Sequence, residues 1–165
     1  MKKLQNILVP TDFSSNSLNA LEYAVNLAKA NESIIHVLHC IEPISSTKNS
    51  TEDNILIHEG LVRLERQMKK FISSVRANTN HKIFEVIRTG KAYEQILNYA
   101  RDAEIDLIVL AANGWSDLQN GILGTVAEKV TRYSAIPVIL IKNNSLAEET
   151  SHKEVKSTLA ENWVG

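Results

Sequence analysis

The chain has 165 residues, of which 44% are hydrophobic and 22% charged, and its formal net charge is -1. These values favour one globular domain with a sizeable core, and the lack of a long basic run argues against nucleic acid or an anionic membrane as a partner. Cys40 is the only cysteine, so no internal disulfide is possible and a reducing compartment is expected.

The first predicted elements are a short buried strand at residues 7–9, preceded by Leu4, and a helix behind it. This apolar run is far too short for a signal peptide or a membrane span, so we expect a soluble, cytoplasmic protein with no membrane partner. Apolar residues then recur at helical spacing over about residues 15–30, which predicts an amphipathic helix. The turn before it offers three side chains as N-caps: Asp12, Ser14 and Ser15.

The second strand is predicted at residues 33–41, which are apolar on both faces, as in a parallel sheet covered on both sides. Residues 43–53 form a connection rich in Ser, Thr and Asn, in which Ser50 and Asp53 have the spacing of a helix cap. A long helix follows and ends at residues 78–80. Its apolar face carries Ile57, Leu61, Leu64, Met68, Phe71 and Val75.

Residues 81–88 alternate between apolar and polar side chains, which predicts a more exposed strand. Thr89 and Gly90 turn the chain after it. A shorter helix follows, marked by Tyr93, Ile96, Leu97 and Ala100.

The continuous apolar run at residues 107–112 predicts a buried strand. It leads through a polar loop with Gly114 and Gly121 to a helix that begins near residue 125 and ends at about residue 134. The last predicted strand begins at Pro137 and ends at Ile141.

Strands and helices alternate strictly along the chain, which predicts an α/β fold: an open, parallel, five-stranded sheet with helices on both faces. This domain is expected to span residues 1–142. Residues 143–165 are polar with scattered apolar positions, and we interpret them as a largely flexible tail with one weak helix.

In such a sheet, ligands bind beyond the carboxyl ends of the strands, where the strand order reverses. Two loops carry suitable residues. One follows the first strand and contains Asp12, which can accept bonds from a sugar or a base, or hold Mg²⁺ through water. The other carries backbone N–H groups for phosphate at Gly114, Gly124 and Thr125. The simpler alternatives are a helix N-cap at Asp12 and a tight loop with a helix cap.

Several blocks of the sequence resemble the universal stress protein family in order and spacing. Gly114, nine residues, and then Gly124 and Thr125 match the second half of its nucleotide motif, Gly-x2-Gly-x9-Gly-(Ser/Thr). The flanking blocks at residues 7–12, 106–109, 126–130 and 137–138 agree as well. The resemblance covers about residues 4–142, and it implies a single-domain member with a Rossmann-like sheet of strand order 3-2-1-4-5.

The resemblance also implies a ligand and a partner. It implies that adenine nucleotides bind between the two loops, and that a homodimer forms by antiparallel pairing of the last strand, from Pro137 to Ile141. Base and ribose are assigned to Pro10, Thr11 and Asp12, with the main chain of Cys40 at the adenine edge. The phosphates are assigned to Gly114, Gly124, Thr125 and Val126.

The sequence departs from the family motif at two positions in the same loop. Ala111 replaces the first motif glycine, and its methyl group can crowd a backbone that must pass close to the nucleotide. Asn113 stands where binders often carry a basic residue or His, and no Lys or Arg lies between Ala111 and Thr125. A triphosphate would then rely on backbone N–H groups, the helix dipole and Mg²⁺.

Other site chemistries are disfavoured by the residues. There is no Gly-x4-Gly-Lys-(Ser/Thr) loop, and the five histidines do not form a metal-ligand set. His36 and His39 lie three apart on a strand and so are expected on opposite faces. Cys40 has no evident activating partner, because its neighbour His39 points away. Trp115 in the loop is interpreted as a packing residue, or as a shield or partner contact.

The leading functional hypothesis is a stress-response regulatory protein that binds ATP or AMP. The alternative is a nucleotide-independent, dimeric interaction module of the same family, whose protein partner the sequence does not name. Slow ATP hydrolysis lacks an evident general base or arginine, so we do not expect an enzyme.

Overall fold

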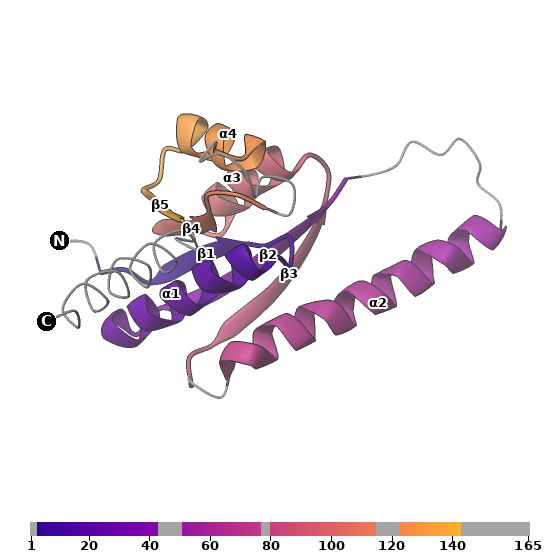
Figure 1. The fold of residues 1–165 in the computed structure, drawn as a ribbon, viewed down its shortest axis with the longest axis horizontal. Helices are drawn as coiled ribbons and strands as arrows, with labels where there is room; N and C mark the ends of the chain where they lie inside the picture. The colour runs from indigo at the N-terminus through magenta and orange to yellow at the C-terminus, as the bar shows by residue number, and fades with distance from the viewer. Residues whose placement is uncertain (1–2, 43–50, 77–79, 115–122, 143–165) are drawn as a thin grey trace, which may run out of the picture.

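The structure is a computed structural model, and it describes residues 3–42, 51–76, 80–114 and 123–142 (Figure 1). The predicted cap at Ser50, the loop residues Trp115 and Gly121, and the tail at 143–165 lie outside the described residues. None of the helices within the described part of the chain is both long enough and apolar enough to cross a membrane.

Five strands and four helices alternate, as the sequence predicted. The strands are β1 (Asn6–Pro10), β2 (Ile34–Ile41), β3 (Ile83–Thr89), β4 (Leu107–Ala111) and β5 (Val138–Ile141). The helices are α1 (Ser15–Asn31), α2 (Thr51–Arg76), α3 (Ala92–Asp102) and α4 (Thr125–Tyr133). Each predicted element is present, and its bounds agree with the prediction to within a few residues.

The sheet is parallel, and its strand order is β3-β2-β1-β4-β5. This confirms the order that the family resemblance implied. β1 lies at the centre, where Leu8 is in register with His36 of β2 and Ile108 of β4. The chain order reverses between β1 and β4, so the loops after these two strands lie side by side at the carboxyl edge.

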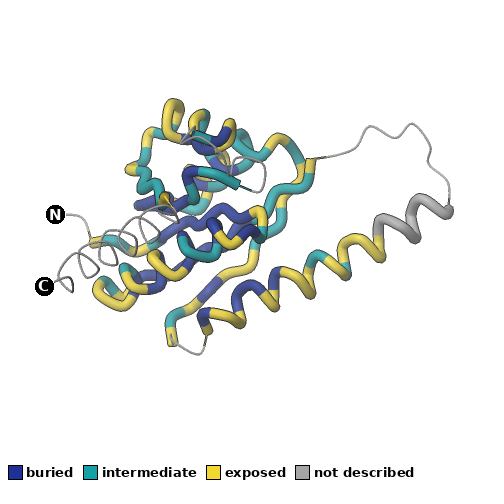
Figure 2. Tube along the Cα trace, in the orientation of Figure 1, coloured by how far each residue is buried: buried dark blue, intermediate teal, exposed yellow. Residues whose placement is uncertain are grey.

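The two faces of the sheet are covered by different helices (Figures 1 and 2). α1 and α2 pack on one face, and α3 and α4 pack on the other. Alternate residues of β1 therefore serve two cores: Ile7 and Val9 face α1, whereas Leu8 faces α3 and α4, and none of the three is exposed. Burial on both faces explains why the central strands are continuously apolar.

The sequence offered three candidate residues for the N-cap of α1. The structure assigns the N-cap to Ser14, whose side chain accepts from the backbone N–H of Ser17 at 3.2 Å. Ser15 is the first helical residue, and Asp12 lies two residues before the cap. At the other end Glu32 takes a left-handed conformation and its N–H bonds the carbonyl of Ala28.

Among the described residues, the other elements cover α2 only in part. Its C-terminal half buries four apolar residues against the sheet and α1: Met68, Phe71, Ile72 and Val75. Its N-terminal half extends away from the sheet (Figures 1 and 2), and Leu61 is 41% exposed. From Leu61 onward, the predicted apolar stripe is therefore buried only in its C-terminal part.

Candidate functional site

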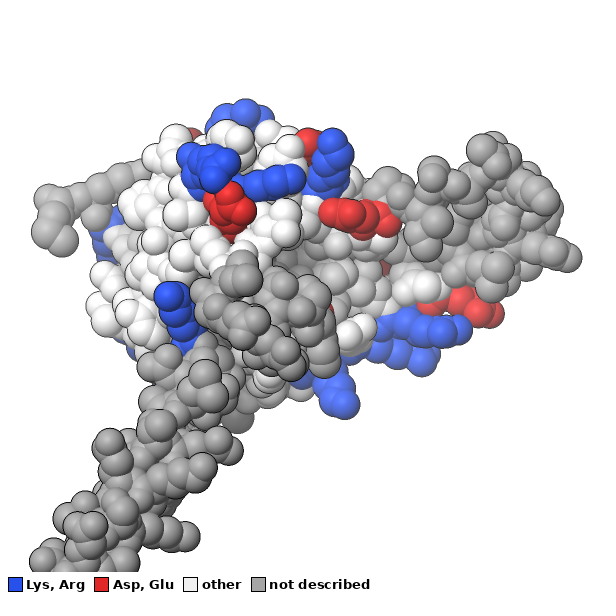
Figure 3. All heavy atoms as spheres, turned by 45° about the horizontal axis from the view of Figure 1, so that its top comes forward, with Lys and Arg blue, Asp and Glu red and all other residues white. Residues whose placement is uncertain are grey.

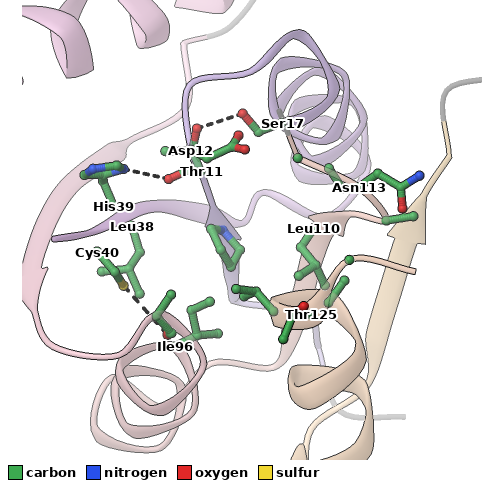
Figure 4. Close-up of a pocket in the computed structure, with 18 residues that line it drawn as sticks. Thr11, Asp12, Ser17, Leu38, His39, Cys40, Ile96, Leu110, Asn113 and Thr125 are labelled. Carbon is green, nitrogen blue, oxygen red and sulfur yellow. Dashed lines mark hydrogen bonds between the residues drawn. The ribbon is translucent and has the colours of Figure 1, made fainter. Parts of the chain in front are cut away.

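A crevice of about 400 Å³ opens at the carboxyl ends of β1 and β4 (Figure 4). The structure brings all ten predicted site residues to its lining: Pro10, Thr11, Asp12, Cys40, Ala111, Asn113, Gly114, Gly124, Thr125 and Val126. Their role in binding stays a prediction. The other lining residues are Ser17, Leu38, His39, Ala92, Ile96, Leu110, Ala112 and Ala127.

One wall of the crevice is the loop between β1 and α1, and Thr11 organises it. The Thr11 backbone N–H donates to the carbonyl of Leu38 at 2.8 Å, which extends the β1–β2 ladder by one bond. Its hydroxyl accepts from the N–H of Phe13 at 2.9 Å and pairs with the Ser17 hydroxyl at 2.9 Å. Thr11 is buried, so these bonds satisfy polar groups that water does not reach.

Asp12 lies on the same wall with its carboxylate held in place. One carboxylate oxygen, Oδ1, accepts from the Ser14 N–H at 3.0 Å and from the Ser14 hydroxyl at 2.6 Å. The same hydroxyl caps α1, so the orientation of the carboxylate is tied to the start of the helix. Asp12 is solvent-exposed, and its side chain lies at the rim of the crevice.

Phe13 adopts a backbone conformation that is rare for a bulky residue, with φ of 64°. Its ring stacks on the imidazole of His39, with centroids 4.4 Å apart, and meets the ring of Phe71 edge-on at 5.6 Å. His39 Nδ1 lies 2.8 Å from the Thr11 carbonyl, which can only accept, so Nδ1 carries the proton. These contacts connect the crevice wall to α2.

The second histidine of β2, His36, lies on the opposite face of the sheet, as predicted. It is buried, and its Nδ1 is 2.8 Å from the hydroxyl of Tyr99 on α3. Nε2 lies 3.4 Å from the side-chain oxygen of Asn6. Burial lowers the pKa of His36 below its ordinary value, because the charged imidazolium loses its hydration there.

The facing wall is the loop between β4 and α4, and it approaches Asp12 closely at Gly114. A Cβ added at Gly114 would lie 2.5 Å from Asp12 Oδ2, so no other residue fits without displacing the carboxylate. Asn16 of α1 donates to the carbonyl of Asn113 at 3.2 Å, which ties the two walls together.

The end of this second loop is closed by Gly124. Its backbone N–H donates to the carbonyl of Ala112 at 2.9 Å. Gly124 is also the N-cap of α4, and it brings no side chain to accept from the first turn. The first N–H groups of a helix have no intrahelical acceptors, and here they belong to crevice-lining residues from Thr125 onward.

Cys40 borders the crevice on the side of α3, and its chemistry is that of a packed thiol. Its Sγ lies 3.8 Å from the carbonyl of Ala92. Burial raises the pKa of the Cys40 thiol to about 11; Glu42 adds to the rise and Arg88 opposes it. The thiol is therefore protonated near neutral pH, which argues against its use as a nucleophile.

The crevice lining carries little charge. Among the described lining residues Asp12 is the only acid, and none is Lys or Arg. On the face of the molecule visible in Figure 3, basic side chains are interspersed with acidic ones and do not form one basic patch. Within the described residues, no group of three His, Cys, Asp or Glu side chains is arranged to hold a metal ion.

Sequence reasoning missed the contribution of α3 to the crevice. Ala92 and Ile96 line it, yet neither carries a polar group or a motif that would have drawn attention. The carboxyl-edge position of the start of α3 was the available signal, because this helix follows β3. His39 lies near the carboxyl end of β2, and its place in the crevice lining follows from that position.

Comparisons with known proteins agree on one family. Residues 3–142 match the family model described as "Universal stress protein family". The sequence is 28% identical over 144 residues to universal stress protein YxiE of Bacillus subtilis, which covers 82% of this chain and 97% of the relative.

Solved structures show the same fold. Universal stress protein UspA from Lactobacillus plantarum matches with a TM-score of 0.66 at 25% identity, over 86% of this chain and 99% of that one. The universal stress protein from Archaeoglobus fulgidus, solved in complex with dAMP, matches with a TM-score of 0.62 at 21% identity, over 86% of this chain and 100% of that one.

Proposed function

The chain belongs to the universal stress protein family, and from this premise we propose that it is a stress-response regulatory protein that binds an adenine nucleotide, ATP or AMP. The ligand binds in the crevice between the β1–α1 and β4–α4 loops. The observation that carries the proposal is the meeting of these loops at the point where strand order reverses, with Gly114 against the carboxylate of Asp12. The solved A. fulgidus relative binds a nucleotide of the same class, dAMP.

The two ends of the crevice suit different parts of a nucleotide. Leu38 and Ile96 offer an apolar surface for a base on the side of the crevice where Cys40 lies (Figure 4). Asp12 at the rim is an acceptor for ribose hydroxyls. The first turn of α4 at Thr125 and Val126 offers N–H groups and the positive end of the helix dipole to a phosphate.

We expect Mg²⁺ in this crevice only when it is coordinated by the nucleotide phosphates. Asp12 is the one lining carboxylate among the described residues, and it can hold a hydrated ion through water. The ion would shield the negative charge of the phosphates from Asp12.

We also propose that two copies pair through β5 in antiparallel register. β5 is the outermost strand next to β4, and all four of its residues are apolar and half-buried. Such an edge has unpaired backbone groups that a second copy can satisfy. Light scattering is expected to give the mass of a dimer, and Val138→Lys to shift it toward a monomer. A monomeric wild-type chain would refute the pairing.

The same crevice lining supports a protein that acts by binding the nucleotide and not by hydrolysing it. No Lys or Arg of the described crevice stands ready to stabilise a transferred phosphoryl group. A phosphate-release assay with ATP is expected to give a rate no higher than the buffer blank. Release above the blank that Gly124→Val abolishes would overturn this.

Thermal melts with AMP and ATP test the nucleotide proposal. A ligand at 100 times its Kd stabilises the folded state by about 2.7 kcal/mol, which is a shift of several degrees for a chain of this size. Gly124→Val is expected to remove the shift, because its side chain enters the crevice lining. No shift with either nucleotide at millimolar concentration would reject nucleotide binding.

That negative result would favour the second candidate, a nucleotide-independent dimeric interaction module. Its supporting observation is the absence of Lys and Arg from the described crevice lining. In that case the glycines serve the turn geometry alone, and Gly124→Val would alter stability while leaving the response to nucleotide at zero.

A further inference from the structure

Phe13 directly follows two residues of the crevice wall, Thr11 and Asp12, and its backbone is left-handed, with φ of 64°. In this conformation the side chain of an L-residue crowds the neighbouring backbone, so a phenylalanine adopts it only where its surroundings hold it there. A return to ordinary φ values would redirect the chain between Asp12 and Ser14. The shape of this wall therefore depends on the contacts of the Phe13 ring.

His39 makes the first of these contacts, and it also belongs to the crevice lining. Its imidazole stacks on the Phe13 ring, with the centroids 4.4 Å apart and the planes 28° from parallel. Its Nδ1–H donates to the carbonyl of Thr11 at 2.8 Å (Figure 4). One imidazole therefore holds both the main chain two residues before Phe13 and the ring of Phe13 itself.

Phe71 makes the second contact, and it connects the wall to a helix outside the crevice. Its ring meets the Phe13 ring edge-on, with the centroids 5.6 Å apart. Phe71 is buried in the C-terminal half of α2, which packs on the sheet and α1. None of the described lining residues belongs to α2. The position of α2 can therefore affect the wall only indirectly, through contacts such as this one.

Ligand affinity depends on how often the wall has its binding shape. A ligand that binds one shape has an apparent Kd equal to its intrinsic Kd divided by the fraction of molecules in that shape. The aromatic contacts that hold Phe13 raise this fraction before the ligand arrives, and so reduce the cost of ordering the loop on binding. Loss of the Phe71 ring would lower the fraction without removing any atom from the crevice lining.

We propose that the docking of α2 regulates ligand binding in the crevice, with Phe71 as a positioning residue that acts through Phe13 and His39 on the β1–α1 wall. The proposal rests on the nucleotide-binding function proposed above and adds a regulatory element to that site. A change that lifts the C-terminal half of α2 from the sheet weakens binding. By linkage, a bound nucleotide stabilises the docked helix by the same factor.

Calorimetric titration of the full chain with AMP and with Mg-ATP tests this coupling, and the nucleotide that binds the wild type more tightly serves as the probe. Phe71→Leu keeps an apolar side chain, removes the ring, and is expected to weaken binding about fivefold or more. If the wild type binds and Phe71→Leu binds equally well, the coupling is refuted while nucleotide binding stands. If the wild type binds neither nucleotide at millimolar concentration, the proposed function fails and the coupling falls with it.

Val75→Ala is the matched control, because Val75 is also buried on α2 and lies one turn farther along the helix. It removes apolar packing of α2 but leaves both aromatic contacts of Phe13 in place. Its affinity should stay within about twofold of the wild type, while its stability in urea falls. Equal losses of affinity in Val75→Ala and Phe71→Leu would indicate a general loosening of the core and would overturn the assignment to Phe71.

A double-mutant cycle tests whether Phe71 acts through Phe13. Phe13→Leu should weaken binding at least as much as Phe71→Leu, since it removes the ring that makes both contacts. The double variant should then lose little more affinity than Phe13→Leu alone. Losses that multiply in the double variant would show two independent routes, and unchanged binding by Phe13→Leu would remove the connecting residue; either result would refute the proposal.

Discussion

The two walls of the crevice are built in different ways. The β1–α1 wall is held by side chains: Thr11, Asp12, Ser14 and Ser17 bond to one another and to the start of α1. In the described part of the β4–α4 wall, two glycines contribute main-chain groups and no side chain. Gly114 makes room for Asp12, and Gly124 contributes a backbone bond and a helix start.

Because of this difference, substitutions in one wall should mainly change stability, and substitutions in the other should mainly change ligand binding. Substitutions in the first wall remove hydrogen bonds that hold the loop and the helix, so they should lower the free energy of unfolding. Substitution of a glycine in the second wall adds a side chain where there was none, so it should reduce the space between the walls. Gly114 is the exception, because its added atom would collide with the first wall.

Gly114→Ala should have the largest effect, because its Cβ would lie 2.5 Å from Asp12 Oδ2. We expect a loss of about 1–3 kcal/mol in the free energy of unfolding, measured by urea denaturation, and a weaker response to nucleotide. Gly60→Ala is the control: its Cβ meets nothing within 4 Å, and in a helix alanine should add about 0.5–1 kcal/mol.

A double-mutant cycle with Asp12→Ala identifies the cause of the Gly114→Ala effect. If the collision with Asp12 is the cause, the double variant should lose clearly less stability than the sum of the two single variants. Simple additivity would show that the collision is not responsible.

Ser14→Ala should have the next largest effect, because it breaks the first wall. The change removes the N-cap of α1 and the hydroxyl bond to Asp12, and about 1 kcal/mol of stability should be lost. The N–H bond to Asp12 survives the substitution, so the loop should keep part of its order. Ser73→Ala on the exposed side of α2 should change stability by less than about 0.5 kcal/mol. Equal effects of the two serine variants would argue against the cap.

The pH dependence of stability reports on His36, which belongs to neither wall of the crevice. Its pKa in the folded chain is lowered by burial, so the unfolded chain takes up the proton first as pH falls. Stability should be full above the ordinary His pKa of about 6.5 and decline as pH falls below it toward the folded pKa. His36→Gln should show a shallower decline in urea melts from pH 7.5 to 5. An unchanged slope would mean that other groups dominate.

Ala111→Gly should have the smallest effect. If the methyl group crowds the nucleotide, affinity should rise about 2–5-fold, the equivalent of roughly 0.5–1 kcal/mol. Ala111 is also the last residue of β4, in register with Ile141, so the glycine should cost a similar amount of stability. Lower stability without tighter nucleotide binding would show that the methyl group of Ala111 does not crowd the nucleotide.

Local patterns predicted most of the fold. The apolar run at residues 7–9 indicates a strand covered on both faces, and the structure buries it completely. The separation of His36 and His39 onto opposite faces follows from the two-residue period of a strand and is confirmed. The strand order came from the family resemblance, because alternation alone does not fix it.

The site was predictable where it depends on motif spacing and not where it depends on tertiary contacts. Gly114 was identified from its distance to Gly124, but its contact with Asp12 joins residues about 100 positions apart in the chain. The positive φ of Phe13 likewise has no local signal, because Phe is not a residue that favours it. Contacts from His39 and Phe71 accompany this conformation, and both lie on other elements.

The partial coverage of α2 has a consequence for amide hydrogen exchange. The turns around Phe71 and Val75 are buried against the sheet, so their amides should exchange only through large-scale opening of the domain. The turns around Leu61 have no such cover within the described residues and rely on local helix stability, which is marginal for a short segment in water. One continuous helix should therefore give two protection levels, with the boundary close to Met68.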